Sequence, residues 1–112
     1  MVYLNGNFIE KDQAFISVLD RGFLFGDGIY EVFPAYNRKI IGLDSHLNRM
    51  QDGLDAISIK NPHSKDEWKN LINKIILFDS INENQAVYLQ ISRGLSLIHI
   101  SEPTRLGMIS YA

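Results

Sequence analysis

Residues 20–49 of the chain read DRGFLFGDGIYEVFPAYNRKIIGLDSHLNR and contain three local patterns in succession. The first, residues 20–28, holds three closely spaced glycines, which permit tight turns and close backbone approaches that a Cβ forbids. The second, residues 29–36, has the β-branched and aromatic composition of a strand. The third begins at Asp44, a good helix N-cap, and continues with apolar residues at helical spacing. A loop, a strand and a helix therefore form the centre of the predicted fold.

The glycines of residues 20–28 allow two interpretations. A phosphate-binding loop continues with lysine and serine or threonine at the start of a helix, but here the glycines flank Asp27, whose charge would repel phosphate. The favoured alternative is a tight structural loop held by buried Phe23 and Phe25 side chains.

The strand at residues 29–36 separates its side chains onto two faces, because successive residues of a strand point in opposite directions. One face carries Tyr30, Val32, Pro34 and Tyr36, and the other carries residues 31, 33 and 35. Pro34 has no backbone N–H to donate, so its position should lie at a sheet edge or bulge.

The rest of the chain predicts further strands and two amphipathic helices. Asn5-Gly6 indicates a hairpin turn within residues 2–9, and Ser64 to Glu67 has the pattern of a capping box at the start of the second helix. The predicted elements are strands at 2–4, 8–9, 29–36, 39–43 and 85–92, and helices at 44–57 and about 64–78. Residues 14–19 are expected to form either another strand or an extended connection. This succession indicates an α/β (α+β) domain in which an antiparallel sheet packs against two helices.

Composition limits the classes of function. The 112 residues fit one domain, and 46% hydrophobic with 21% charged residues is typical of a globular protein. Eleven basic and 13 acidic residues give a net charge of −2 without a basic patch, so we expect no nucleic acid partner. The chain has no cysteine and no apolar run of the roughly 18 residues that a membrane span needs, so we expect no membrane partner and a cytoplasmic location.

Residue spacing alone identifies no self-sufficient catalytic set. His46, His63 and His99 do not have metal-ligand spacing with carboxylates, so we expect no metal site. Tyr30, Arg49 and Arg93 remain as candidates for binding. Without further information, a tyrosine at the core edge, a solvated arginine and a surface ion pair are the favoured interpretations of these three residues.

Four motifs, in order and at matching spacing from residue 1 to about Gly94, change that balance. They are Asp20-Arg21-Gly22, Phe25 to Val32 (FGDGIYEV), Asp44-x-His46-Leu47-x-Arg49, and Tyr88 to Gly94 (YLQISRG). Together they resemble the small N-terminal domain of the fold-type-IV, class IV aminotransferases, which use pyridoxal 5′-phosphate. That family includes D-amino acid aminotransferase, branched-chain aminotransferase and aminodeoxychorismate lyase.

The resemblance implies roles for individual residues. It assigns Arg49 to the phosphate of the cofactor, which suits a guanidinium that can bridge two phosphate oxygens. It assigns Tyr30 to the substrate side, with Pro34 and Tyr36 on the same strand face. The run IYEVFPAY most resembles D-amino acid aminotransferases, so we expect transfer of an amino group between D-alanine or another D-amino acid and a 2-oxo acid. Fragments of a branched-chain aminotransferase or of aminodeoxychorismate lyase, and a non-catalytic binding module, are the alternatives.

The chain departs from the D-amino acid members in two respects. Ile98 and Ile100 stand where those members have an arginine and a histidine that grip the substrate carboxylate. The family's Schiff-base lysine belongs to a larger C-terminal domain, and no lysine of this chain matches its motif. The resemblance therefore implies no catalytic residue here, an inactive chain when alone, and exposed apolar surface where a second domain and the partner of a homodimer would pack.

Residues 95–112 (LSLIHISEPTRLGMISYA) abandon the family pattern. They resemble the translation of a sequencing adapter joined to a truncated reading frame, and we expect them to provide no closing strand. The domain would then comprise residues 1–94. A genuine variant tail, with a strand at 95–100 ended by Pro103, is the rival interpretation.

Overall fold

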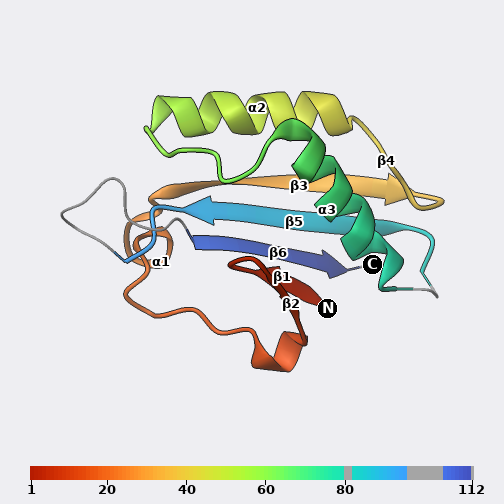
Figure 1. Cartoon of the computed structure of the whole chain (residues 1–112), viewed down its shortest axis with the longest axis horizontal. Helices are drawn as coiled ribbons and strands as arrows, with labels where there is room; N and C mark the ends of the chain where they lie inside the picture. The colour runs from red at the N-terminus through yellow and green to blue at the C-terminus, as the bar shows by residue number, and fades with distance from the viewer. Residues whose placement is uncertain (80–81, 96–104, 112) are drawn as a thin grey trace.

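An antiparallel sheet forms the centre of the computed structural model, which describes residues 1–79 and 82–95 and, for the backbone alone, residues 105–111. Within that part of the chain the sheet has six strands in the order β2-β1-β6-β5-β3-β4 (Figure 1). The strands are β1 (Val2–Leu4), β2 (Asn7–Ile9), β3 (Gly28–Tyr36), β4 (Lys39–Ile40), β5 (Gln85–Ser92) and β6 (Arg105–Tyr111). The fold is therefore the predicted α+β arrangement with an antiparallel sheet.

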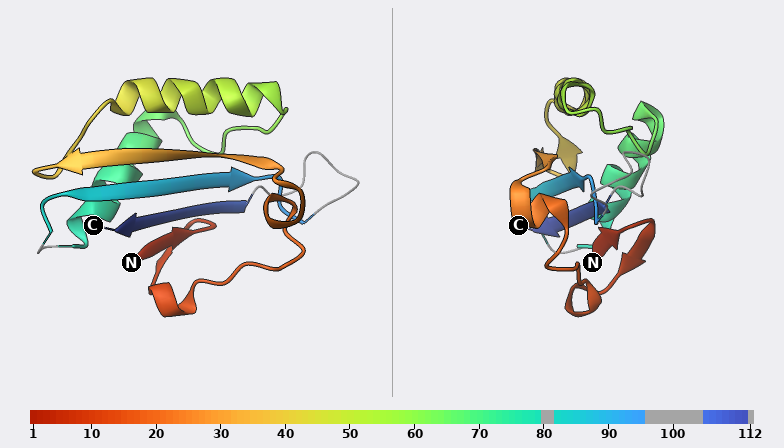
Figure 2. Two further views of the ribbon diagram at one scale, coloured as in Figure 1. Left: turned by 180° about the vertical axis from the view of Figure 1, so that it is seen from behind. Right: turned by 90° about the vertical axis from the view of Figure 1, so that its left-hand side faces the viewer.

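Two longer helices cover one face of this sheet, as predicted. Helix α2 (Leu43–Ala56) runs along β3, and α3 (Lys65–Leu77) crosses β5 and β6 (Figure 1). Two short helical segments, η1 (Lys11–Gln13) and α1 (Arg21–Phe25), lie before β3. In the right-hand view of Figure 2, α2 is seen end-on above the edge of the sheet and α3 lies beside the sheet.

The two helices begin in different ways. Helix α3 has the predicted capping box, in which Ser64 accepts from the backbone N–H of Glu67 and Glu67 accepts from that of Ser64. The N-cap of α2 is Gly42, at φ 68°, so the prediction of Asp44 as N-cap was wrong. Asp44 lies in the first turn instead, where a carboxylate interacts favourably with the helix dipole. Its side chain forms an ion pair with Lys69 at 2.8 Å.

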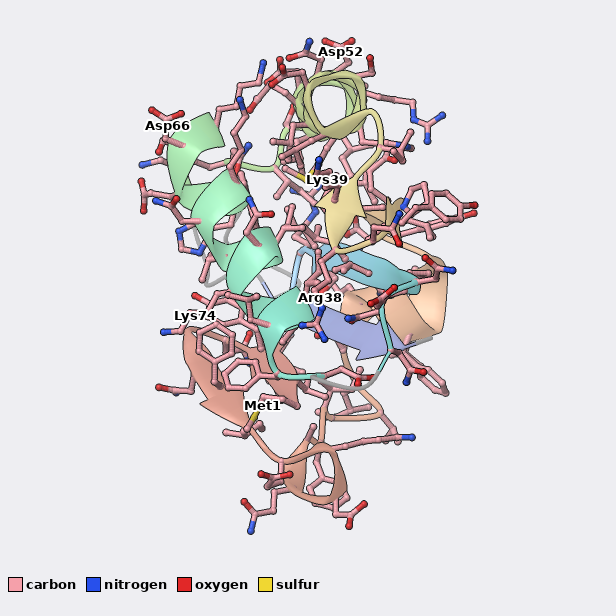
Figure 3. The ribbon with its side chains drawn as sticks, turned by 90° about the vertical axis from the view of Figure 1, so that its right-hand side faces the viewer. Met1, Arg38, Lys39, Asp52, Asp66 and Lys74 are labelled. Carbon is pink, nitrogen blue, oxygen red and sulfur yellow. The ribbon has the colours of Figure 1, made fainter. Side chains whose placement is uncertain are left out.

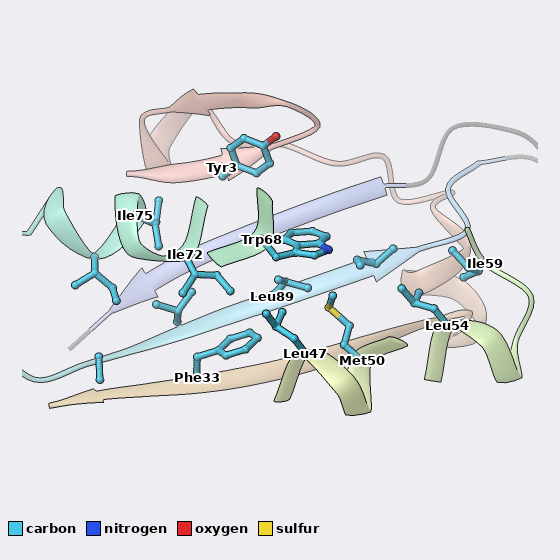
Figure 4. Packing of buried hydrophobic residues seen from close by; sticks show 14 residues of the cluster. Tyr3, Phe33, Leu47, Met50, Leu54, Ile59, Trp68, Ile72, Ile75 and Leu89 are labelled. Carbon is cyan, nitrogen blue, oxygen red and sulfur yellow. The ribbon is translucent and has the colours of Figure 1, made fainter. Parts of the chain in front are cut away.

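The hydrophobic core lies between the helices and the covered face of the sheet (Figure 4). Helix α2 contributes Leu47, Met50 and Leu54, and α3 contributes Trp68 with Ile72, all of them buried. Burying such side chains stabilises the fold by roughly 1.5–3 kcal/mol each before ordering costs are counted. Charged residues such as Asp52 of α2 and Asp66 of α3 point outward from the molecule (Figure 3).

The N-terminal segment confirms the predicted hairpin and decides between the two alternatives for residues 14–19. Asn5 and Gly6 have φ angles of 49° and 93° and turn β1 into β2, as the Asn-Gly pair predicts. Residues 14–19 form no strand, so of the two predicted alternatives the structure has the connection. Their apolar side chains are largely exposed, and Phe15 is 80% exposed, so this segment obtains none of the burial that would fix it in a sheet.

The tail contains a strand that the sequence analysis did not expect. Residues 105–111 form β6, which pairs with β1 on one side and with β5 on the other. The expectation that the tail provides no closing strand was therefore wrong. The rival prediction of a strand at 95–100 falls almost entirely outside the described residues, as do Ile98 and Ile100.

Candidate functional site

A groove of about 510 Å³ runs between β3 and α2. Strand β4 pairs only with Ala35 and Tyr36 of β3, so within the described part of the chain the outer edge of residues 28–33 has no strand partner. Gly53 of α2 lets the helix lie close to this strand, because a Cβ at that position would come within 3.2 Å of the Ile29 side chain. The groove is lined by Gly28, Ile29, Tyr30, Glu31, Val32, Arg49, Met50 and Gly53.

Arg49 is held at this groove by a buried carboxylate. Glu31, which is 3% exposed, accepts two hydrogen bonds from the Arg49 guanidinium, from Nε at 2.6 Å and from Nη2 at 2.8 Å. His46 Nδ1 lies 2.8 Å from the second Glu31 oxygen. His46 and Arg49 thus share one side of α2, as their spacing predicts. The Arg49 side chain remains 71% exposed, so its guanidinium is fixed in direction but open to a ligand.

The electrostatics of this cluster keep its charges in place. Burial alone would raise the pKa of Glu31, but the hydrogen bonds from Arg49 and His46 outweigh burial and hold the pKa below its ordinary value. The same contact with Glu31 raises the pKa of Arg49 above its ordinary value. Glu31 is therefore a charged anchor, and Arg49 remains a cation at every physiological pH.

Tyr30 lies at the same groove but on the other face of β3. Glu31, Phe33 and Ala35 are buried against the helices, whereas Tyr30 is 65% exposed on the open face with Tyr36. The alternation predicted for this strand is confirmed. Tyr30 is therefore more exposed than the core-edge tyrosine that residue spacing alone favoured. Its ring stacks on Tyr88 of β5, with ring centroids 5.6 Å apart and ring planes 16° from parallel.

A second, smaller hollow of about 290 Å³ adjoins Tyr30 on the open face. Its lining combines the glycines of the loop with two strands, and consists of Gly22, Gly26, Gly28, Ile29, Tyr30 and Gln90. Gly22 must be glycine for this loop to lie on β5, because a Cβ there would come within 2.7 Å of the Ser92 Cβ. The two hollows share residues 28–30, so Tyr30 stands between them.

The glycine loop is held by polar contacts and not by its phenylalanines. Phe23 and Phe25 are 68% and 65% exposed, so the prediction that they are buried was wrong. Asp20 is buried instead and accepts hydrogen bonds from the Gly22 backbone N–H and from the Ser92 hydroxyl. The apolar side chains of α1 are left largely exposed.

The sequence suggested that the charge of Asp27 would repel phosphate, but in the structure this charge has two arginine partners. Its carboxylate accepts from Nε of both Arg21 and Arg93, each at 2.8 Å. Burial would raise the pKa of Asp27, but these two arginines outweigh it and lower the pKa. Its charge is thus compensated by one arginine of the loop and by one that follows β5. Arg93 also donates a hydrogen bond to the backbone carbonyl of Ile57 and so links the end of β5 to the end of α2. Of the two interpretations of Arg93, the structure therefore has the ion pair.

Glu31 is the residue of the site that sequence reasoning missed. It lies between Tyr30 and Val32 in a strand whose other residues on its own face are Ile29, Phe33 and Ala35. A carboxylate on the buried face of a strand requires a partner, and this signal could have identified it. The described residues contain no cluster of three or more potential metal ligands, and no described helix is long and apolar enough to cross a membrane.

Comparison with known proteins identifies the family. The family model for amino-transferase class IV matches residues 28–110, which is most of the chain. The chain belongs to the class IV aminotransferases. The match begins at the first residue of β3 and extends into β6, so it includes the strand, the helix and the ion-paired cluster that form the groove.

Curated relatives of this aminotransferase chain are D-alanine aminotransferases. The protein of that name from Listeria monocytogenes is 36% identical over 94 residues, which cover 84% of the chain and 32% of the relative. The one from Staphylococcus aureus is 35% identical over 103 residues, covering 92% of the chain and 36% of the relative. The chain thus spans about a third of the length of the curated relatives that it matches.

Solved structures share the fold of this aminotransferase domain. The branched-chain amino acid aminotransferase of Escherichia coli has a TM-score of 0.87 at 15% identity, over 99% of the chain and 40% of that protein. A hypothetical aminotransferase from Mycobacterium tuberculosis, solved in a PLP-bound form, has a TM-score of 0.84 at 17% identity, over 99% and 39% respectively. At these identities the likeness concerns the fold alone.

Proposed function

We propose that this chain forms one wall of the active site of a pyridoxal-phosphate-dependent transaminase that acts on D-alanine or another D-amino acid and a 2-oxo acid. Membership of the class IV aminotransferases and similarity to D-alanine aminotransferases support the reaction class. When bound, the cofactor supplies the electron sink for transfer of the amino group. The contribution of this chain is to bind and orient the cofactor and the substrate.

The observation that carries the proposal is the geometry of Arg49. Two of its nitrogens are occupied by Glu31, and the guanidinium is exposed at a groove of about 510 Å³, so a cation of fixed direction faces a space large enough for a small ligand. A phosphate group would find the remaining guanidinium N–H donors already oriented, which lowers the entropic cost of binding. The donor set of this groove therefore fits the phosphate of pyridoxal 5′-phosphate.

Tyr30 is the substrate-binding residue in this proposal. Its exposed phenol borders the groove that contains Arg49, so one small molecule can reach both residues. The hydroxyl can donate a hydrogen bond to a substrate carboxylate while the ring packs against the ligand. Pro34 and Tyr36 follow on the same face of β3 and extend the substrate side of the site.

Binding of pyridoxamine 5′-phosphate to the chain tests the proposal directly. This cofactor form has no aldehyde that could react with surface lysines, and pyridoxamine without phosphate is its matched control. We expect saturable binding that requires the phosphate and is weakened about tenfold or more in Arg49→Gln, since a charge-assisted hydrogen bond contributes roughly 1.5–3 kcal/mol. Arg38→Gln, in the turn between β3 and β4, should bind normally. If Arg49→Gln bound pyridoxamine 5′-phosphate as tightly as the unaltered chain does, the assignment of Arg49 to the phosphate would be contradicted.

The chain alone should have no transaminase activity, because none of its lysines matches the lysine motif of the family. After incubation with pyridoxal 5′-phosphate and borohydride, mass spectrometry should find only scattered, substoichiometric labelling of lysines. Stoichiometric labelling of one lysine would overturn this part of the proposal. It would also reject the alternative of a non-catalytic binding module.

We further propose that the whole protein is a cytoplasmic homodimer. Apolar side chains on and before α1, including Phe15, Phe23 and Phe25, are exposed, and a partner subunit or a further domain would cover them. Sedimentation of the chain at rising concentration tests this, because uncovered apolar surface should produce association. Phe23→Asp should reduce that association, whereas a monodisperse monomer at all concentrations would contradict it.

The origin of residues 95–112 is a separate proposal. We propose that residues 95–112 come from an adapter sequence joined after Gly94, because Ile98 and Ile100 replace the arginine and histidine of the D-amino acid members. The match of the family model extends to residue 110, which favours a genuine tail instead. Independent sequencing of the source DNA beyond the codon for Gly94 tests this. Reads that continue unbroken into the present tail would reject an adapter origin and support a genuine strand β6.

A further inference from the structure

Gln90 is a polar residue of the open face that the proposed function leaves without a role. In the register of the sheet it lies directly opposite Tyr30, so the two side chains stand side by side on the face that the helices do not cover. Both line the hollow of about 290 Å³ beside the glycine loop. Gln90 is therefore adjacent to the proposed substrate residue and open to the same space.

The amide of Gln90 is held in one orientation by its neighbour on β5. The Tyr88 hydroxyl donates a hydrogen bond of 2.8 Å to the carbonyl oxygen Oε1 of Gln90. The Tyr88 ring is itself stacked on Tyr30. Because its oxygen end is held by Tyr88, the NH₂ end of the amide points away from Tyr88, and it can only donate hydrogen bonds.

The NH₂ end of Gln90 reaches the wall that the glycine loop provides. Its Nε2 atom lies 3.2 Å from the position that a Cβ on Gly22 would occupy. The same position lies 2.7 Å from the Ser92 Cβ and 3.0 Å from the Asp20 Oδ1, so the Gln90 amide lies close against the loop. Gln90 lines the adjoining hollow together with Tyr30 and the glycines of the loop.

We propose that Gln90 is a specificity-determining residue that donates a hydrogen bond to a carboxylate oxygen of the amino-acid or 2-oxo-acid substrate. The inference rests on the proposed function and extends it from Tyr30 to the neighbouring strand. The lining of the hollow offers a phenol and an amide but no charged side chain, so recognition there depends on neutral donors. The hollow adjoins the groove of Arg49 through residues 28–30, so phosphate and carboxylate would lie on opposite sides of the β3 edge.

The side-chain NH₂ resonances of Gln90 in the ¹⁵N-labelled chain provide the test, with pyruvate as the probe and acetone, which lacks the carboxylate, as its control. We expect a saturable shift with pyruvate and none with acetone. Gln90→Glu keeps the acceptor for Tyr88 but replaces the donor by a like charge, and should weaken pyruvate binding about tenfold or more, as loss of a hydrogen bond to a charged group does. Gln13→Glu makes the same charge change at an exposed position of η1 and should bind pyruvate normally.

Tyr88→Phe separates orientation from donation. It keeps the ring that stacks on Tyr30 but frees the Gln90 amide, so pyruvate binding should weaken several-fold while the backbone amide spectrum stays unchanged. The proposal is overturned if pyruvate does not shift the Gln90 NH₂ signals, or if Gln90→Glu binds pyruvate as tightly as the unaltered chain. Pyridoxamine 5′-phosphate and the Nε–H signal of Arg49 report separately on the phosphate site, so failure there with a normal response at Gln90 contradicts only the proposed function.

Discussion

The two faces of β3 differ in what covers them, although their residues alternate along a single strand. On the covered face Phe33 and Ala35 are buried beneath the helices, and on the open face Tyr30 and Tyr36 are exposed. The covered face therefore contributes most of the stability of the sheet, and the open face is available for binding. Glu31 belongs to the covered face but orients Arg49 at the groove, so it connects the face that stabilises the sheet with the residue proposed to bind a ligand.

Truncating one aromatic residue on each face should produce the largest contrast. Phe33→Ala removes a fully buried ring and should lower the free energy of unfolding by about 3–5 kcal/mol. Tyr36→Ala on the same strand removes an exposed ring and should cost less than about 1 kcal/mol. Urea unfolding of both variants measures the difference. Similar losses in the two variants would mean that the open face also contributes to the core.

Gly22→Ala should disturb the loop that borders the open face. The added Cβ would come within 2.7 Å of the Ser92 Cβ, so the loop must move, at a cost of about 1–3 kcal/mol, as for overpacking elsewhere. Gly6→Ala is the control, because its Cβ would meet no atom within 4 Å and only the strain of φ 93° remains. Thermal unfolding compares them, and a smaller loss in Gly22→Ala than in Gly6→Ala would contradict the close packing of the loop.

Glu31→Gln should change how stability depends on pH. The folded pKa of Glu31 is below its ordinary value, so its contribution to stability is present above that ordinary value and is lost as the pH falls through the folded pKa. The unaltered chain should therefore exceed Glu31→Gln in stability at pH 7, by roughly 1–3 kcal/mol for the hydrogen bonds to charge. This advantage should shrink below about pH 4. A difference in unfolding free energy that does not change with pH would contradict a lowered pKa.

Tyr30→Phe should have the smallest effect on stability. The hydroxyl is on an exposed residue, so we expect the free energy of unfolding to change by less than about 0.5 kcal/mol. Binding of pyruvate should weaken nonetheless, because the substrate loses a donor. Unfolding and pyruvate titration on the same preparation check both expectations. A large loss of stability would mean that Tyr30 belongs to the core.

Much of the fold follows from local pattern. The alternation of β3 and β5, the capping box at Ser64 and the apolar stripes of α2 and α3 depend on neighbours within a few residues, and the structure has these elements within one or two residues of the prediction. The sequence left residues 14–19 open between a strand and an extended connection, because their apolar composition resembles that of a strand, whereas only tertiary contacts decide whether such residues are buried.

The site was only partly predictable for the same reason. Tyr30 and Arg49 were identified by motif, and both line the groove. The pairing of Glu31 with Arg49 joins residues 18 positions apart, and the pairing of Asp27 with Arg93 joins residues 66 apart, so neither follows from local spacing. Charge partners of this kind become visible only when the strand and the helix are packed together.

The bond between Glu31 and Arg49 has a thermodynamic consequence for any ligand of this groove. The guanidinium acquires its direction only when α2 is docked on β3, so the anion site does not exist in the unfolded chain. A ligand that binds there must then shift the unfolding equilibrium, by about 2.7 kcal/mol at a concentration one hundred times its Kd. The groove thus couples occupancy to the docking of a helix, and saturation with ligand should slow hydrogen exchange in α2 more than in the hairpin of β1 and β2.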